Sequence, residues 1–369
     1  MSQLDLLDFS ELESGSLPKD YSNFEHRFPE PQYLGAKYTH LEWIRKFIPH
    51  STKIALDGFA GSHSVAFLLK QIGIQTISND YLNFNNQIGV ALIKNQGVKL
   101  NNYDLKVLFD ENVDFSSHTL IQNNYANLFF IPEEAAFLDR FRFNVERIAC
   151  EYKRALAICI MNRSMTRKIT MGHFAHTQAL IYASNPDRIK RNKSLIRPLR
   201  EIFNELLPFY NQAVFSNGKS NQSYNSNILE LIPNLTNVDL AYFDPPYCGS
   251  HSDYQGFYHL LETYTEYWRD KSFINSIKRY EPQRHSGFDK KSSALDSLNK
   301  LFEISESIPT WLISYNDRSY PNISDFKQMI SKHRDVIVES KTYEAGRGGK
   351  GSVAGSKEIL FICTPKRFY

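Results

Sequence analysis

A carboxylate, two prolines and an aromatic residue directly follow an apolar run of β-forming residues at positions 238–243. This tetrad is Asp244-Pro245-Pro246-Tyr247. The two prolines lack backbone N–H groups and fix φ, so the Asp244 carboxylate and the Pro245 carbonyl are held as acceptors that face one cleft. The exocyclic amino group of a nucleobase offers two N–H donors and would satisfy both acceptors. Bonds of this kind direct the lone pair of the amine toward an electrophile, which predicts group transfer to that nitrogen.

Tyr247 would add a flat apolar surface beside these acceptors. Stacking of a nucleobase on an aromatic ring contributes about 1–3 kcal/mol, which is comparable with the few kcal/mol that extruding a base from a duplex costs. The tetrad therefore predicts a catalytic site, made of Asp244, Pro245, Pro246 and Tyr247, that binds a flipped base. The alternative is a proline-rich turn with a packing tyrosine.

A second set of candidate residues lies in a strand-turn-helix pattern over 52–73. Its turn, Asp57-Gly58-Phe59-Ala60-Gly61-Ser62, is made mainly of small residues. In a doubly wound sheet, ligands lie beyond the carboxyl ends of the strands, and small residues let backbone N–H groups approach them. The next predicted strand ends at Asp80, where an acidic side chain can accept hydrogen bonds from both hydroxyls of a ribose. The spacing alone fits any nucleoside-binding α/β domain, or a plain tight turn with a surface aspartate.

The elements around these motifs alternate between strand and helix at both ends of the chain. Helical spacing of apolar residues predicts a short amphipathic helix over 37–49. Strands are predicted within 52–57, 74–80, 237–243, 310–317, 335–340 and 357–365. About 100 residues between the two alternating parts have a mainly helical pattern. We therefore predict an α/β fold, a doubly wound Rossmann-like sheet with a largely helical insertion.

Positive charge is concentrated in that insertion. The formal net charge is +3, but residues 140–200 hold 14 Lys and Arg against three acidic residues, which is +11, so the rest of the chain carries −8. Asn, Ser, Thr and His lie between the basic residues and can contact phosphates and base edges. We predict nucleic-acid contacts from Arg163, Arg167, Lys168, Lys190, Arg191 and Lys193. A solvated helical face is the alternative.

The order of these motifs resembles that of S-adenosylmethionine-dependent DNA methyltransferases of the adenine-N6 type, in the alpha group that includes Dam-like enzymes and the modification methylases of restriction systems. The segment LDGFAGSHSVA resembles the D-x-F-x-G-x-G motif, with Asp57, Phe59 and Gly61 matching and His63 where the second glycine is usual. SNDYLNFNNQIGVALIKN resembles the N-D segment of the family. This resemblance implies that Asp80 is the ribose ligand.

Two further segments carry the resemblance. YLGAKYTHLEWIRKFIP resembles the N-terminal cofactor motif, which implies that Lys37 lies near the methionine carboxylate. YNSNILELIPNLTNVDL resembles the segment before the catalytic strand, with Asn227 where Asp is common near the cofactor adenine. The resemblance also places Asp244 beside the cofactor.

The resemblance implies direct transfer of a methyl group from S-adenosyl-L-methionine to the amino nitrogen of a flipped adenine in duplex DNA, without a metal. A cognate restriction endonuclease would be a functional partner. We expect residues 33–114 and 213–369 to form the cofactor-binding catalytic domain and residues 115–212 to recognise the target. Residues 1–32, which are polar and acidic, are expected to form a weakly ordered N-terminal segment.

Composition excludes several other classes of protein. The four cysteines show no C-x-x-C spacing, which argues against a zinc ribbon or a disulfide scaffold. No apolar run reaches the length of a membrane span, and the first 18 residues contain no Lys or Arg, so we expect a soluble, cytoplasmic protein. Three readings stay open: an RNA adenine or cytosine-N4 methyltransferase, a non-catalytic DNA-binding regulator on the same fold, and a dinucleotide oxidoreductase, which the glycine pattern disfavours.

Overall fold

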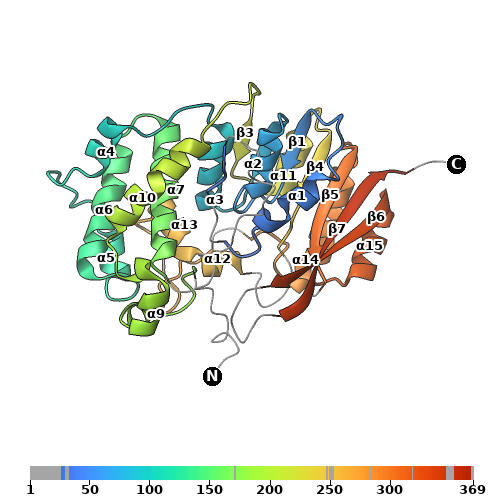
Figure 1. Ribbon diagram of the computed structural model, residues 1–369. Helices are drawn as coiled ribbons and strands as arrows, with labels where there is room; N and C mark the ends of the chain where they lie inside the picture. Colours follow the sequence, from blue (N-terminus) through green and yellow to red (C-terminus); the bar gives the residue numbers. More distant parts are fainter. Residues whose placement is uncertain are drawn as a thin grey trace.

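The computed structural model describes residues 26–29, 33–169, 172–246, 248, 253–282, 285–317, 319–345 and 353–366. Its strands form one seven-stranded sheet in the order β3-β2-β1-β4-β5-β7-β6 (Figure 1). They are β1 (Ile54–Asp57), β2 (Gln75–Asn79), β3 (Gln222–Tyr224), β4 (Leu240–Phe243), β5 (Thr310–Asn316), β6 (Arg334–Ala345) and β7 (Val353–Pro365). β7 runs antiparallel to both neighbours, and the other pairs are parallel. The predicted α/β class with a doubly wound sheet is confirmed.

The strands that carry the motifs form where the apolar runs predicted them. All four residues of β4 are buried, as expected for a central strand of a parallel sheet that is covered on both faces. β1 ends at Asp57, and β2 ends one residue before Asp80. Because the carboxyl ends of parallel strands meet at one edge, Asp57, Asp80 and Asp244 come together there.

One strand was not predicted, and two are longer than predicted. β3 has the sequence QSY, pairs with β2 alone and has no buried residue, so no apolar periodicity marks it. β6 and β7 extend toward each other as a long antiparallel pair. Their backbones pair as far as Ala345 and Val353.

Alternate residues of each strand face two separate hydrophobic layers. On one face, Ala55, Leu240, Tyr242 and Leu312 pack against α1 (Leu41–Arg45), α2 (Ser64–Gln71) and the helices that follow β2. That layer also contains α3 (Asn83–Ile88), and the π-helix η5 (Gly89–Lys94) continues it.

The opposite face of the sheet presents Leu56, Ala241, Phe243 and Trp311. These residues pack on α11 (Ile228–Leu231), α14 (Lys291–Ile304) and α15 (Ile323–Ser331). The period of two residues in each strand therefore builds a three-layer structure.

The predicted helical interruption lies beside the β3 edge of the sheet (Figure 1). Its helices are α4 (Asn102–Leu108), α5 (Leu120–Tyr125), α6 (Pro132–Glu146), α7 (Glu151–Arg167), α8 (Ala179–Ala183), α9 (Pro186–Arg191) and α10 (Leu199–Ala213). Buried residues of α6, α7 and α10 belong to the same hydrophobic cluster as the sheet face. The helical part therefore shares a core with the sheet, and its role in target recognition stays a prediction.

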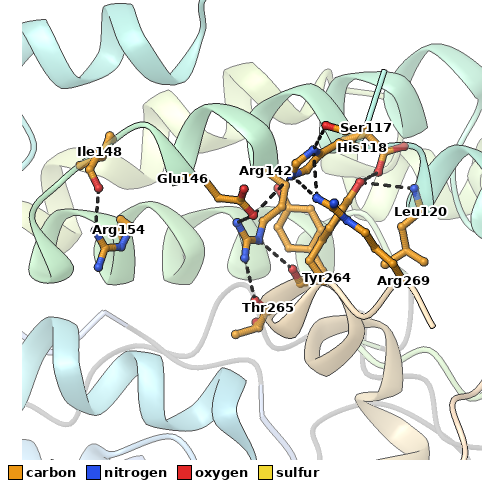
Figure 2. A network of polar contacts seen from close by, with 12 residues as sticks. Ser117, His118, Leu120, Arg142, Glu146, Ile148, Arg154, Tyr264, Thr265 and Arg269 are labelled. Atoms are coloured by element: carbon orange, nitrogen blue, oxygen red, sulfur yellow. Dashed lines mark hydrogen bonds and ion pairs between the residues drawn. The ribbon is translucent and has the colours of Figure 1, made fainter. Parts of the chain in front are cut away.

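A polar network ties the chain after β4 to this helical part (Figure 2). Arg142 of α6 donates to the carbonyls of Tyr264 and Thr265, in α13 (His259–Glu266). It also pairs with Glu146 at 2.9 Å, and Glu146 lies 3.3 Å from the ring of buried His118. Arginine here bridges carbonyls at a helix end, which would otherwise need water. The chain that follows β4 is thus anchored to the helical part of the molecule.

The described residues before position 33 are packed on the sheet domain. Phe28 is buried between Tyr38 and Phe67, and the ring of His26 stacks on Phe215 with centroids 4.5 Å apart. The other residues of the predicted N-terminal segment 1–32 lie outside the described residues. Among the helices of the described part of the chain, none has both the length and the apolar character needed to cross a membrane.

Candidate active site

A pocket opens at the carboxyl ends of β1, β2 and β4. It holds about 1000 Å³ of empty space, which includes the open solvent at its mouth. The structure brings nine residues singled out from the sequence to its walls: Lys37, Asp57, Phe59, Gly61, Asp80, Asn227, Asp244, Pro245 and Pro246. Tyr247, the last member of the tetrad, lies outside the described residues.

Asp57 closes β1 and holds the start of α2. Its Oδ2 atom accepts a hydrogen bond from the backbone N–H of Ala66 at 2.9 Å, and its Oδ1 atom is buried without a hydrogen-bond partner among the described residues. Burial raises the pKa of Asp57 well above its usual range, since the single bond from Ala66 offsets only part of the desolvation. An unpaired buried oxygen is costly. Asp57 is therefore prepared to accept a donor group from a ligand.

His63 keeps the backbone conformation that glycine favours at this place in the turn. Its φ is 61°, in the left-handed region, and α2 begins at the next residue. Its ring is buried and packs toward Gly89, where an added Cβ would come within 2.6 Å of the ring. Burial lowers the pKa of His63 to about 3, with the backbone of Asn85 opposing the shift. The helix start is thus retained with histidine in place of glycine.

Asp80 connects the two turns that face the pocket. Its Oδ2 atom accepts from the N–H of Gly61 at 2.8 Å, and its Oδ1 atom accepts from the N–H of Leu82 at 2.8 Å and from Asn85 at 3.2 Å. Burial raises the pKa of Asp80, and these three bonds oppose the shift. A carboxylate oxygen has two acceptor sites, so Oδ2 retains capacity for a ligand.

Asn227 caps helix α11. Its Oδ1 atom accepts from the backbone N–H of Leu229 at 3.0 Å, which is the usual role of Asp or Asn before a helix. The side-chain amide N–H₂ group of Asn227 can therefore donate a hydrogen bond to a ligand. A donor can pair with a ring nitrogen of an adenine, whereas an aspartate could only accept from its amine.

The ammonium group of Lys37 lies between two carboxylates. It contacts Asp244 at 2.7 Å and Glu358 at 3.5 Å, and it donates to the carbonyl of Gly35 at 3.0 Å. Burial alone would lower the pKa of Lys37, but Asp244 and Glu358 outweigh it and raise the pKa above its ordinary value. Lys37 is therefore a charged, nearly inaccessible group, and the methionine carboxylate predicted to bind it would compete with Asp244.

Sequence reasoning did not single out Glu358. It belongs to β7, where it pairs with Asn316 of β5 and Lys341 of β6, and its side chain is 5% exposed. Burial raises the pKa of Glu358 to about 7, with Lys37 opposing and Asp244 adding to the shift. A glutamate at the start of an apolar strand was the available signal, but only strand pairing brings it to Lys37.

Three tyrosines that sequence reasoning also missed form a stack beside the pocket. The ring of Tyr33 stacks on those of Tyr254 and Tyr258, with centroid distances of 5.6 and 4.9 Å. The Tyr258 hydroxyl accepts from the N–H of Leu34 at 2.9 Å. Tyr254 belongs to α12 (Tyr254–Phe257), which follows the catalytic motif. The stack thus fixes the backbone that carries Lys37 against the chain that leaves β4.

The predicted nucleic-acid contacts fall into two groups. Lys190, Arg191 and Lys193, on α9 and the 3-10 helix η6 (Lys193–Leu195), are exposed. In Figure 1, α9 lies at the lower edge of the molecule, below and to the left of α12. Contact of this group with DNA stays a prediction.

The other group lies at the end of α7, where it makes contacts within the helical part. Arg167 pairs with Glu205 at 2.8 Å, and Lys168 pairs with Glu134 at 2.6 Å. Arg163 is half-buried and lines a second pocket, which α7 shares mainly with α3, α13 and the residues around Phe28. These contacts give Arg167 and Lys168 a structural role, and their contact with DNA stays a prediction.

Comparison with known proteins agrees with this geometry. Residues 33–312 match the family model of D12 class N6 adenine-specific DNA methyltransferases. The chain is also 32% identical, over 343 residues, to the Type II methyltransferase M2.HphI of Haemophilus parahaemolyticus, and the match covers 91% of this chain and 98% of that protein. The resemblance seen in the motifs is confirmed. The chain belongs to the D12 class of N6 adenine-specific DNA methyltransferases.

Proposed function

We propose that the pocket binds S-adenosyl-L-methionine and an adenine flipped out of duplex DNA, and that the protein modifies one DNA sequence as part of a restriction-modification system. The observation that carries this proposal is the convergence of Asp244 and Pro245 with Asp57, Asp80 and Lys37 in one pocket. A Type II methyltransferase as relative supports the restriction-modification context, in which a cognate endonuclease would be a functional partner and the DNA would lie in the cytoplasm.

The residues present fit the methyl donor. Asp57 has a buried Oδ1 atom without a partner in the described structure, suited to an ammonium group, and Asp80 retains acceptor capacity for a ribose hydroxyl. Asn227 offers an amide donor to a purine ring, and Gly61 and Phe59 line the turn beside it. When bound, the donor supplies an electrophilic methyl group on a positively charged sulfonium. The carboxylates of Asp57, Asp80 and Asp244 favour that positive charge.

The residues after β4 act on the other reactant. The Asp244 carboxylate and the Pro245 carbonyl accept the two N–H groups of the adenine amine, which points its lone pair into the pocket. Holding the amine about 3 Å from the carbon it attacks supplies several kcal/mol of the barrier. Tyr247 stacks on the base. Asp244 thus polarises and orients the nucleophile and forms no covalent bond itself.

The exposed cluster of Lys190, Arg191 and Lys193 is proposed to hold the duplex through its phosphates. Such contacts position the duplex, whereas base contacts specify the sequence. We assign sequence preference to the helical part as a whole, since it lies beside the β3 edge of the sheet and carries the excess positive charge. Arg163, Arg167 and Lys168 would act there by shaping the surface.

The test is transfer of a labelled methyl group. The protein is incubated with labelled S-adenosyl-L-methionine and unmethylated duplex DNA, and the DNA is digested to nucleosides. Label in N6-methyladenine is the expected result. Label in N4-methylcytosine, or in RNA but not DNA, would establish one of the alternative substrates, and absence of label from both polymers would refute the proposal.

A further inference from the structure

Lys37 and its two carboxylates form a chain that leads from the pocket into the sheet. Asp244 lines the pocket, and Lys37 contacts it at 2.7 Å. Glu358 contacts the same ammonium at 3.5 Å, and it is not among the residues that line the pocket. The ion pair with Lys37 therefore links Glu358 to the pocket.

Lys37 and the target amine would both donate to the Asp244 carboxylate, whose oxygens have room for both donors but share one negative charge. An ammonium is a stronger hydrogen-bond donor than a neutral amine, and a bond from it withdraws negative charge from the Asp244 carboxylate. The adenine amine needs that charge, since Asp244 is proposed to polarise it. A buried ammonium also cannot be left without an anion. Lys37 can move away from Asp244, and so leave that carboxylate to the amine, only if a second anion binds the Lys37 ammonium.

We propose that Glu358 is a positioning residue for methyl transfer: its carboxylate holds the ammonium of Lys37, so that Asp244 is available to the amino group of the target adenine. This inference rests on the proposed function. It assigns a role to a strand residue more than 100 positions after the catalytic tetrad. The state that is unfavourable for methyl transfer is the one in which Lys37 binds Asp244 and not Glu358.

The charge state of Glu358 then controls the reaction. The groups that face it are Lys37 from η4 (Lys37–His40), Asp244 after β4, Asp317 after β5, Lys341 opposite it on β6, and the hydroxyls of Tyr242 and Tyr254. Burial raises the pKa of Glu358 to about 7, Lys37 opposes this, and Asp244 and Asp317 add to it. Above that pH the carboxylate holds Lys37, and below it the protonated acid releases Lys37 to Asp244. Methyl transfer should therefore rise with pH through the neutral range.

The experiment compares single-turnover rates of wild type and Glu358→Gln across pH, at saturating S-adenosyl-L-methionine, on a duplex whose site is found by sequencing DNA methylated by the wild type. Glu339→Gln is the matched control, because it removes a carboxylate from the neighbouring strand β6, away from the pocket. We expect the wild-type rate to rise through about pH 7. Glu358→Gln should transfer at least about tenfold more slowly above that pH and show no such rise, while the control follows the wild type.

Cofactor affinity, measured by calorimetry, should change less than about threefold in Glu358→Gln, since Glu358 does not face the pocket. A rate loss with an unchanged pH profile would show a merely structural role and overturn the inference. Should Glu358→Gln fail to fold, the wild type decides alone, because a flat profile through the neutral range overturns the inference equally. If the wild type methylates no adenine at any pH, the proposed function fails instead.

Discussion

The ion pair between Lys37 and Asp244 allows the structural and catalytic roles of Asp244 to be measured separately. The perturbation is Asp244→Asn, which keeps the shape of the side chain and removes its charge. Asp244 is 18% exposed and Lys37 is 6% exposed. Breaking a buried ion pair by neutralising one partner costs about 3–5 kcal/mol when the other charge is left alone. Here the ammonium retains the Gly35 carbonyl at 3.0 Å and Glu358 at 3.5 Å.

The expected loss of stability is therefore smaller, about 1–3 kcal/mol, which is about 1–4 °C in Tm for a chain of this size. The effect on methyl transfer should be larger. Removing one preorganised electrostatic group from an active site lowers the rate by about 100- to 1000-fold. Binding of S-adenosyl-L-methionine should persist, because Asp57, Asp80 and Asn227 still line the pocket.

The assay combines thermal melts, calorimetry and single-turnover transfer for four proteins: wild type, Asp244→Asn, Lys37→Met and the double variant. The double variant should regain at least about 1 kcal/mol relative to the sum of the single effects, since it leaves no unpaired ammonium. Its transfer rate should stay low. Near-normal transfer by Asp244→Asn, or recovery of transfer together with stability in the double variant, would show that Asp244 serves only to neutralise Lys37.

Three further predictions concern the remaining site residues. Tyr247→Phe should keep much of the transfer activity and Tyr247→Ala should lose most of it, because the work is stacking; equal reductions in steady-state assays would move the role to the hydroxyl. Asp80→Ala should weaken S-adenosyl-L-methionine binding in calorimetry far more than DNA binding, and unchanged cofactor affinity would refute its placement at the ribose. The triple alanine variant of Lys190, Arg191 and Lys193 should bind all duplexes more weakly, with a log–log salt slope smaller by about 0.9 for each phosphate that the variant no longer neutralises; a wild-type slope would make this surface a solvated face.

Much of the pocket could be predicted because it depends on local patterns. Short apolar runs that end in an acidic residue place Asp57, Asp80 and Asp244 at strand ends, and parallel pairing of β1 with β2 and β4 then brings those ends to one edge. The family resemblance added Lys37 and Asn227. Both the apolar runs and the family motifs can be recognised without knowing which distant segments of the chain are in contact.

The partners of these residues were decided by the tertiary structure. Lys37 was predicted to lie near the carboxylate of a ligand, and in the structure it binds Asp244 and Glu358. The side-chain oxygen of Asn227 caps a helix. Arg167 and Lys168, predicted at DNA, pair with acidic residues of other helices. A run of basic residues is visible in the sequence, but the anion that each one meets depends on helix packing.

The sequence by itself thus determined the class of sheet, the strand ends and the chemistry they carry, because strand periodicity and turn-forming residues act within a few positions. Only the tertiary structure decided that Asp244 and Glu358 of β7 meet the ammonium of Lys37, and that the ring of Tyr33 stacks on two tyrosines that follow β4. Those contacts join segments far apart in the chain. A buried charged group pairs with the oppositely charged group that packing brings within a few ångströms of it. The local sequence does not indicate which group that is.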